Sequence, residues 1–136
     1  MSGTTPSSWG EVLDRAFRRG RFVLLVVTAD EAGLPHVGKA DGLKPGKEGR
    51  LQISGWLCAT TVRNLKRNPR LTVVVQAEPE GVQLAGRLES LQEDAMLDGY
   101  ADGTRRMPQV RWRLTLRPTQ LMRFREGEHA DEVVEL

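Results

Sequence analysis

Short runs of β-forming residues, separated by turns rich in glycine and proline, constrain the fold of this chain more than any other feature. The densest run, Phe22–Thr28, is rich in valine and is typical of a strand buried on both faces. Val110–Leu116 alternates apolar and basic residues, as a strand with one buried face does. Further strands are expected at Pro35–Ala40, Arg50–Ser54, Leu71–Gln76, Val82–Leu91 and Leu121–Phe124. Antiparallel strands with few helices favour a small β-barrel, since closing the sheet removes its exposed edges.

Helices and loops are expected only between these strands or at the ends of the chain. Ser8 can cap a helix from about Trp9 to Arg19, where apolar residues recur at helical spacing. Gln92–Tyr100 also has helical composition, and Gly42–Gly49 has the composition of a loop. Pro118 is expected to end the strand before it, because proline has no N–H for a sheet.

The segment Ala59–Pro69 is a short basic insert between two of the expected strands. It has two threonines near its start, and it predicts a short helix. The first N–H groups of a helix have no partner within it, and the helix dipole favours an anion there. Arg63 would add positive potential beside Thr60 and Thr61. The functional hypothesis is a phosphate-bearing ligand at the helix start; the alternative is that a threonine only caps the helix.

Size and charge restrict the class of protein. The 136 residues fit one domain, 1–136, with a core at about 9–126 and an acidic tail at 127–136. The net charge of +2 predicts no nucleic-acid partner. No apolar run approaches the roughly 20 residues that span a bilayer, and residues 1–8 do not resemble a signal peptide. We therefore expect a cytoplasmic protein with no membrane partner.

Cys58 is the single cysteine, so a disulfide within the chain is excluded. Neither His36 nor His129 is near it in sequence, which favours a packed thiol over a nucleophile. One cysteine and two histidines also predict no structural metal site.

The order of three sequence segments is similar to that of a known family. An acidic turn leads into Gly33–Val37, the basic insert ends in Asn64–Arg70, and a later strand contains Leu84–Leu88. In this order and spacing, the chain from about Arg19 to Phe124 resembles the pyridoxamine 5'-phosphate oxidase-like superfamily of flavin-binding split barrels, including its short FMN-binding members.

This resemblance implies a mainly β fold, a six-stranded antiparallel split β-barrel of the Greek-key type with short crossover helices. It also implies a homodimer with FMN at the interface and its phosphate near the start of the helix after the third strand. Many members have a Ser/Arg/Lys-type cluster where this chain has Ala59, Thr60 and Thr61. The residues expected to contact the cofactor are Lys39, Ser54, Trp56, Thr60, Thr61, Arg63, Asn64, Arg111 and Arg113.

Among these residues, Lys39 is the candidate for stabilising the reduced flavin, and Trp56 for packing near its ring. The implied function is a flavin-dependent oxidoreductase acting on an unidentified small molecule. True pyridoxamine phosphate oxidases are longer and end in an Arg/Trp-rich segment, so vitamin B6 oxidation is not expected. The alternatives are a non-catalytic flavin-binding or electron-transfer protein, a split barrel that binds the deazaflavin F420, and a structural dimer without a cofactor. Haem is less expected, because neither histidine has the surroundings of an axial ligand.

Overall fold

A computed structural model describes residues 22–77, 80–97, 109–125 and 132–134. The helix expected at 9–19 lies outside these residues, as does most of the acidic tail. The elements in chain order are β1 (Val23–Ala29), β2 (Pro35–Ala40), β3 (Gly42–Pro45), the 3-10 helix η2 (Lys47–Gly49), β4 (Leu51–Gly55), α2 (Ala59–Arg67), β5 (Arg70–Ala77), β6 (Glu80–Leu97), β7 (Gln109–Arg125) and β8 (Glu132–Val134).

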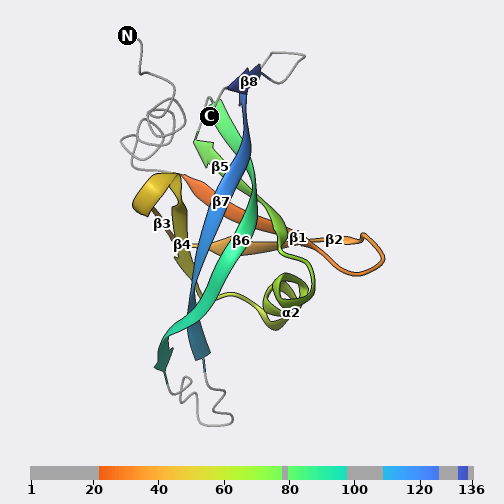
Figure 1. Cartoon of the computed structure of the whole chain (residues 1–136), viewed down its shortest axis with the longest axis vertical. Helices are drawn as coiled ribbons and strands as arrows, with labels where there is room; N and C mark the ends of the chain where they lie inside the picture. The colour runs from red at the N-terminus through yellow and green to blue at the C-terminus, as the bar shows by residue number, and fades with distance from the viewer. Residues whose placement is uncertain (1–21, 78–79, 98–108, 126–131, 135–136) are drawn as a thin grey trace.

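The strands form one antiparallel sheet that curls into a split barrel (Figure 1). Their order is β2-β1-β5-β6-β7-β4-β3, and β8 pairs with β7. Strands β2 and β3 are separated only by Asp41, yet they pair with β1 and β4 at opposite ends of this order. The chain therefore joins the two ends of the sheet at this bend. The Asp41 N–H donates to the Ser54 carbonyl at 3.0 Å, which holds this bend against β4.

A close backbone contact explains why the last residue of β4 is a glycine. A Cβ atom on Gly55 would lie 2.9 Å from the Ala40 Cα, so a larger residue would push β2 and β4 apart. The connection from β4 to β5 then passes through α2, which packs against β1 and β2 at one end of the barrel (Figure 1).

The core follows from alternation along the strands, because successive side chains point to opposite faces of a sheet. In β1, Leu24 and Val26 are buried while Leu25 and Val27 are partly exposed. Burying each such aliphatic side chain contributes about 1.5–3 kcal/mol. The buried apolar residues are Leu24, Val26, Leu51, Ile53, Leu57, Val62, Leu65, Leu71, Val73, Val75, Val82, Leu84, Leu114, Leu116 and Leu121. The inner face of the barrel therefore forms one core, which α2 completes.

The prediction of a mainly β split barrel is confirmed, but the strand number is not. The expected strands correspond to β1, β2, β4, β5, β6 and β7, while β3 and β8 make eight strands within the described residues. Strand β3 lies in the segment expected to be a loop, Gly42–Gly49. It pairs with β4, and Leu43 packs against the core, so tertiary pairing outweighs the loop-like composition.

The helix expected at Gln92–Tyr100 is wrong as far as Leu97, where β6 ends. Strand β6 pairs with β7 along this stretch, and Arg113 of β7 lies 3.7 Å from the Asp94 carboxylate. Sheet pairing again outweighs a helical composition.

Pro118 does not end its strand, and β7 continues from Gln109 to Arg125. Pro118 lies opposite Gly86, where the β6–β7 register shifts between Ala85 and Gly86. An irregularity of this kind tolerates a residue without an N–H. The Thr119 hydroxyl donates to the Ala85 carbonyl at 3.2 Å, so that carbonyl has a partner.

Candidate functional site

Helix α2 is the short helix predicted from the basic insert, and it lies in the connection from β4 to β5. Cys58 is its N-cap residue, with an extended backbone, and the Val62 N–H donates to the Cys58 carbonyl at 3.2 Å. The first turn contains no acidic residue. One face of α2, with Thr61, Val62, Asn64 and Leu65, is buried against the barrel, while Arg63 is exposed.

Thr61 is fully buried (0% exposed) and its hydroxyl lies 3.2 Å from the Cys58 sulfur. It does not cap the helix, because Cys58 precedes the first turn. The residue opposite on β2 is Gly38, where a Cβ would be 2.7 Å from the Thr61 Oγ1. Glycine at this position therefore lets the helix start lie directly on β2. Thr60, next to Thr61, is partly exposed.

Cys58 is exposed and has a histidine partner from a distant part of the sequence. The Cys58 Sγ lies 3.1 Å from the His36 Nε2. Partial burial raises the pKa of the thiol, but the Thr61 hydroxyl, the Thr61 backbone N–H and His36 outweigh it and lower the pKa from 9.0 to about 7. Because the thiolate is the reactive form, this thiol is activated at neutral pH.

The expectation of a packed thiol without a nearby base was therefore wrong. The register of β1 with β2 places His36 opposite Thr28 at the barrel side of β2, next to the helix start. Sequence separation conceals this contact, and no local motif signals it. Within the described residues, no group of three His, Cys, Asp or Glu side chains is arranged to hold a metal ion.

Asn64 is buried and serves as an internal link between α2 and β1. Its amide donates to the Thr28 hydroxyl at 3.1 Å, and both side chains are almost completely inaccessible. Buried polar groups of this kind contribute to a fold when they are paired. Asn64 therefore has a structural role, which is to join α2 to β1.

A second polar cluster lies at the β2–β3 bend and contains three of the predicted cofactor residues. Arg111 donates to both oxygens of Asp41, at 2.9 and 2.6 Å, and to the Ser54 hydroxyl at 3.3 Å. The Arg111 side chain holds the pKa of the Asp41 carboxyl below its usual value. The Arg111 guanidinium also lies 5.6 Å from the ring centre of Trp56, within the range of a cation–π contact.

Lys39 and Arg113 lie apart from the helix start. Lys39 is exposed and pairs in register with Leu25, on the face of β2 opposite to Gly38. Arg113 contacts Asp94 and, at 3.5 Å, the Gln92 side chain. The structure thus brings Ser54, Trp56 and Arg111 together at the bend and Thr60, Thr61, Arg63 and Asn64 together on α2.

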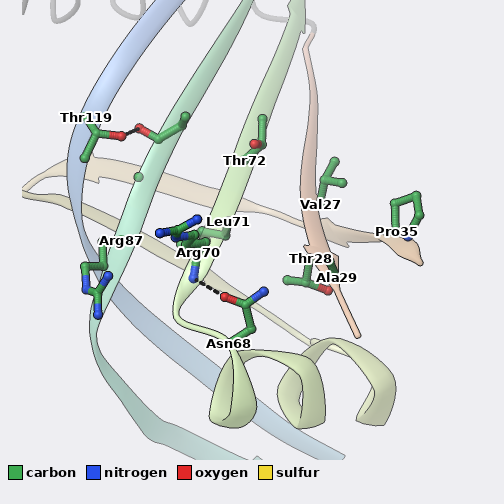
Figure 2. Close-up of a pocket in the computed structure, with 12 residues that line it drawn as sticks. Val27, Thr28, Ala29, Pro35, Asn68, Arg70, Leu71, Thr72, Arg87 and Thr119 are labelled. Atoms are coloured by element: carbon green, nitrogen blue, oxygen red, sulfur yellow. Dashed lines mark hydrogen bonds between the residues drawn. The ribbon is translucent and has the colours of Figure 1, made fainter. Parts of the chain in front are cut away.

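A cavity of about 590 Å³ lies on the outside of the sheet and was missed by the sequence analysis (Figure 2). Its apolar lining includes Val27 and Ala85, and Arg70 and Arg87 also line it. None of the nine predicted cofactor residues does. Arg70 and Arg87 do lie in the segments that carry the family resemblance, but only the pairing of β5 with β6 places them side by side.

The pyridoxamine 5'-phosphate oxidase family model matches residues 14–123 of this chain. Since the match covers most of the sequence, the protein belongs to the pyridoxamine 5'-phosphate oxidase family. This confirms the resemblance found from the order of sequence segments. No match to a curated protein was found. No described helix has the length and apolarity needed to cross a membrane.

Several solved structures share the fold at low sequence identity. A pyridoxamine 5'-phosphate oxidase-related, FMN binding protein from Nostoc punctiforme is 15% identical, with a TM-score of 0.63 over 91% of this chain and 87% of that chain. A NimC/NimA family protein from Clostridium acetobutylicum is 15% identical, with a TM-score of 0.61 over 97% and 94%. HupZ from Group A Streptococcus is 15% identical, with a TM-score of 0.57 over 87% and 97%. These similarities support the split-barrel fold.

Proposed function

We propose that this protein binds FMN at the start of α2 and acts as a flavin-dependent oxidoreductase on a small molecule. Family membership supports a flavin. The observation in this chain that carries the proposal is a helix start without an acidic residue, beside the exposed Trp56 and the exposed Arg63. Backbone N–H groups and a nearby cation suit a phosphate, and an indole face suits a flat ring.

The contacts at this site divide the tasks among the residues. The Thr61 hydroxyl already interacts with Cys58, so the phosphate contacts fall to the helix N–H groups, Thr60 and Arg63. Trp56, with 39% of its surface exposed, would contact the ring system. The flavin supplies the redox chemistry when bound, and the protein orients it and controls access.

The functional unit is proposed to be a homodimer that covers the outer face of β2 and the adjoining part of β1 and β5 around Leu25, next to the cavity lined by Arg70 and Arg87 and not over it. This part of the face carries Val23, Leu25 and Val74, and Val37 is 56% exposed. A sheet face with so many aliphatic side chains is stabilised when another layer covers it. Lys39 shares this face, so in the dimer it would point towards the partner subunit and could act on a cofactor held there.

Absorbance at about 370 and 450 nm, where oxidised flavins absorb, tests the cofactor assignment in purified protein. Protein without these bands should take up added FMN, and riboflavin should bind roughly 100-fold more weakly because it has no phosphate. Reduction of the bound flavin by NAD(P)H would support the oxidoreductase over an electron-transfer protein. Equal affinity for FMN and riboflavin would contradict a phosphate site at α2.

Two variants locate the phosphate. Thr60→Ala and Arg63→Ala should each weaken FMN binding by about 1–3 kcal/mol, the usual contribution of a hydrogen bond to a charged group. Arg67→Ala is the matched control, since Arg67 is at the other end of α2 and contacts Glu31 at 3.0 Å. If F420 binds while FMN does not, the deazaflavin alternative replaces this assignment.

A further inference from the structure

Three arginines lie next to one another across three neighbouring strands on the outside of the barrel. Arg70 of β5 pairs in register with Arg87 of β6, and Arg87 pairs with Arg117 of β7. We call these three residues the arginine ladder. All three are exposed. Side chains directly opposite in an antiparallel pair have Cβ atoms about 4.5–5.5 Å apart, and like charges at that distance are destabilising.

Among the described residues, the acidic partners of the ladder lie at one of its ends. The Arg117 Nε lies 3.5 Å from a Glu89 oxygen, and Glu89 is shared with Arg50, whose Nε lies at 2.7 Å. Within the described residues, neither Arg70 nor Arg87 has an acidic side chain within ion-pair distance. The charges of Arg70 and Arg87, at the β5–β6 end of the ladder, therefore have no acidic partner in the described part of the chain.

These two arginines line the 590 Å³ cavity, whose other walls are largely apolar (Figure 2). Val27, Thr72 and Ala85 lie on neighbouring strands beneath it. A cavity with an apolar lining and a few converging charged groups has the composition of a small-molecule site. Arg70 and Arg87 favour an anionic group on the ligand, and the apolar lining favours a hydrophobic body.

The break in the β6–β7 register contributes to the shape of this cavity. Gly86 and Thr119 both line the cavity. They lie where Pro118, which has no N–H, interrupts the hydrogen bonding between β6 and β7. Irregularities of this kind occur next to binding sites, because they redirect side chains and free part of the sheet surface.

We propose that this cavity binds a small organic anion with an apolar body and an oxyanion end, a carboxylate or a phosphate monoester, held by Arg70 and Arg87. An oxyanion between the two guanidinium groups makes charge-assisted hydrogen bonds and relieves their mutual repulsion. The site is distinct from the proposed flavin site at the start of α2, and the inference does not depend on that assignment.

The experiment uses 8-anilinonaphthalene-1-sulfonate, a fluorescent organic anion, as the probe on the full chain. The probe should bind, and the double variant Arg70→Gln/Arg87→Gln should weaken binding by about 10-fold or more, as for the loss of charge-assisted contacts. Lys44→Gln/Lys47→Gln removes the same charge from exposed positions outside the cavity and should leave binding unchanged. Circular dichroism of each variant verifies that the fold is retained.

Competition identifies the oxyanion. Benzoate displacing the probe at lower concentration than phenyl phosphate would support a carboxylate ligand, and the reverse order a phosphate monoester. The uncharged N-phenyl-1-naphthylamine should bind equally well to the wild-type chain and the arginine variant. Two results would overturn the proposal: equal losses in the arginine and lysine variants, or inorganic phosphate competing as well as the aromatic anions.

Discussion

The start of α2 and the arginine ladder are both polar regions on the same barrel, but their side chains are arranged in opposite ways. At the helix start, the Cys58 sulfur lies 3.1 Å from the His36 ring and 3.2 Å from the Thr61 hydroxyl. At the ladder, Arg70 and Arg87 face each other as like charges. The first arrangement stabilises the folded protein by itself, whereas the second becomes favourable only when an anion is present.

This difference has a consequence for ligand binding. A ligand at the helix start must use the groups that the cluster leaves available, such as the helix N–H groups and Arg63. A ligand at the arginine ladder meets Arg70 and Arg87, which have no acidic partner among the described residues and so give up no ion pair when the ligand binds. Substitutions at the helix start should therefore change the stability of the fold more than substitutions at the ladder.

The largest effect is expected at the contact between β2 and the helix start. Gly38→Ala would place a Cβ 2.7 Å from the Thr61 Oγ1 and should lower the free energy of unfolding by about 1–3 kcal/mol, as overpacking does. In a Thr61→Ala background the nearest remaining atom of residue 61, its Cβ, is 3.8 Å away, so the cost should largely disappear. Urea denaturation of the four members of this double-mutant cycle measures the coupling. Additive effects would show that the contact is not under strain.

The next effect concerns the link between α2 and β1. Asn64→Ala removes the donor of the buried 3.1 Å hydrogen bond to Thr28 and should cost about 1–3 kcal/mol. The double variant Thr28→Val/Asn64→Leu removes both polar partners and should recover most of that loss, because no buried group is then left unpaired. Thermal unfolding monitored by circular dichroism compares them. A double variant as unstable as Asn64→Ala would show that packing, and not the hydrogen bond, matters here.

Sequence patterns predict this structure best where local pattern and tertiary structure agree. Alternation along β7 correctly predicted its buried face, and Ala59–Arg67 forms the expected helix. The prediction that β1 is buried on both faces was wrong, because only alternate residues such as Leu24 and Val26 are buried. Sequence patterns also fail where pairing between strands decides the structure. The end of β6 has the composition of a helix, and Pro118 is a residue that commonly ends a strand. Only the long pairing of β6 with β7 shows that both segments are strands.

The same limit applies to the functional residues. Thr60, Thr61 and Arg63 could be placed at a helix start because they are neighbours in sequence. The contact between His36 and Cys58 depends on how β2 lies against α2, and the arginine ladder depends on the registers of three strands. Arg70, Arg87 and Arg117 are separated by 30 or fewer residues from strand to strand, but nothing local shows that they meet.

The helix-start cluster also predicts a pH-dependent thiol. With a pKa of about 7, half of Cys58 is thiolate at pH 7, so alkylation by iodoacetamide should rise with a midpoint near pH 7. After allowance for the lower nucleophilicity of a low-pKa thiolate, the rate at pH 7 should be about fivefold higher than in the urea-unfolded chain. His36→Ala should move the midpoint towards 9, with Lys39→Ala as the control on the opposite face of β2. An unchanged midpoint in His36→Ala would remove His36 from the cluster.

The lowered pKa also gives the sign of a stability change. Because the folded-state pKa of Cys58 is below its ordinary value of 9.0, the folded state binds fewer protons than the unfolded state between these values. The stabilisation is complete above pH 9 and is lost as the pH falls through about 7. Cys58→Ser should abolish this part of the pH dependence, as measured by urea denaturation across that range.

The smallest effect is expected at the ladder, and it has the opposite sign to those at the helix start. Arg87 lies between Arg70 and Arg117, so Arg87→Gln removes both like-charge contacts and should raise the free energy of unfolding by about 0.2–1 kcal/mol at low salt. The gain should shrink as salt is added, because these charges are exposed and are screened. Lys44→Gln, at an exposed position outside the ladder, should produce no such gain. A loss of stability in Arg87→Gln at every salt concentration would show that the arginines do not repel one another, and the contrast between the two regions would then fail.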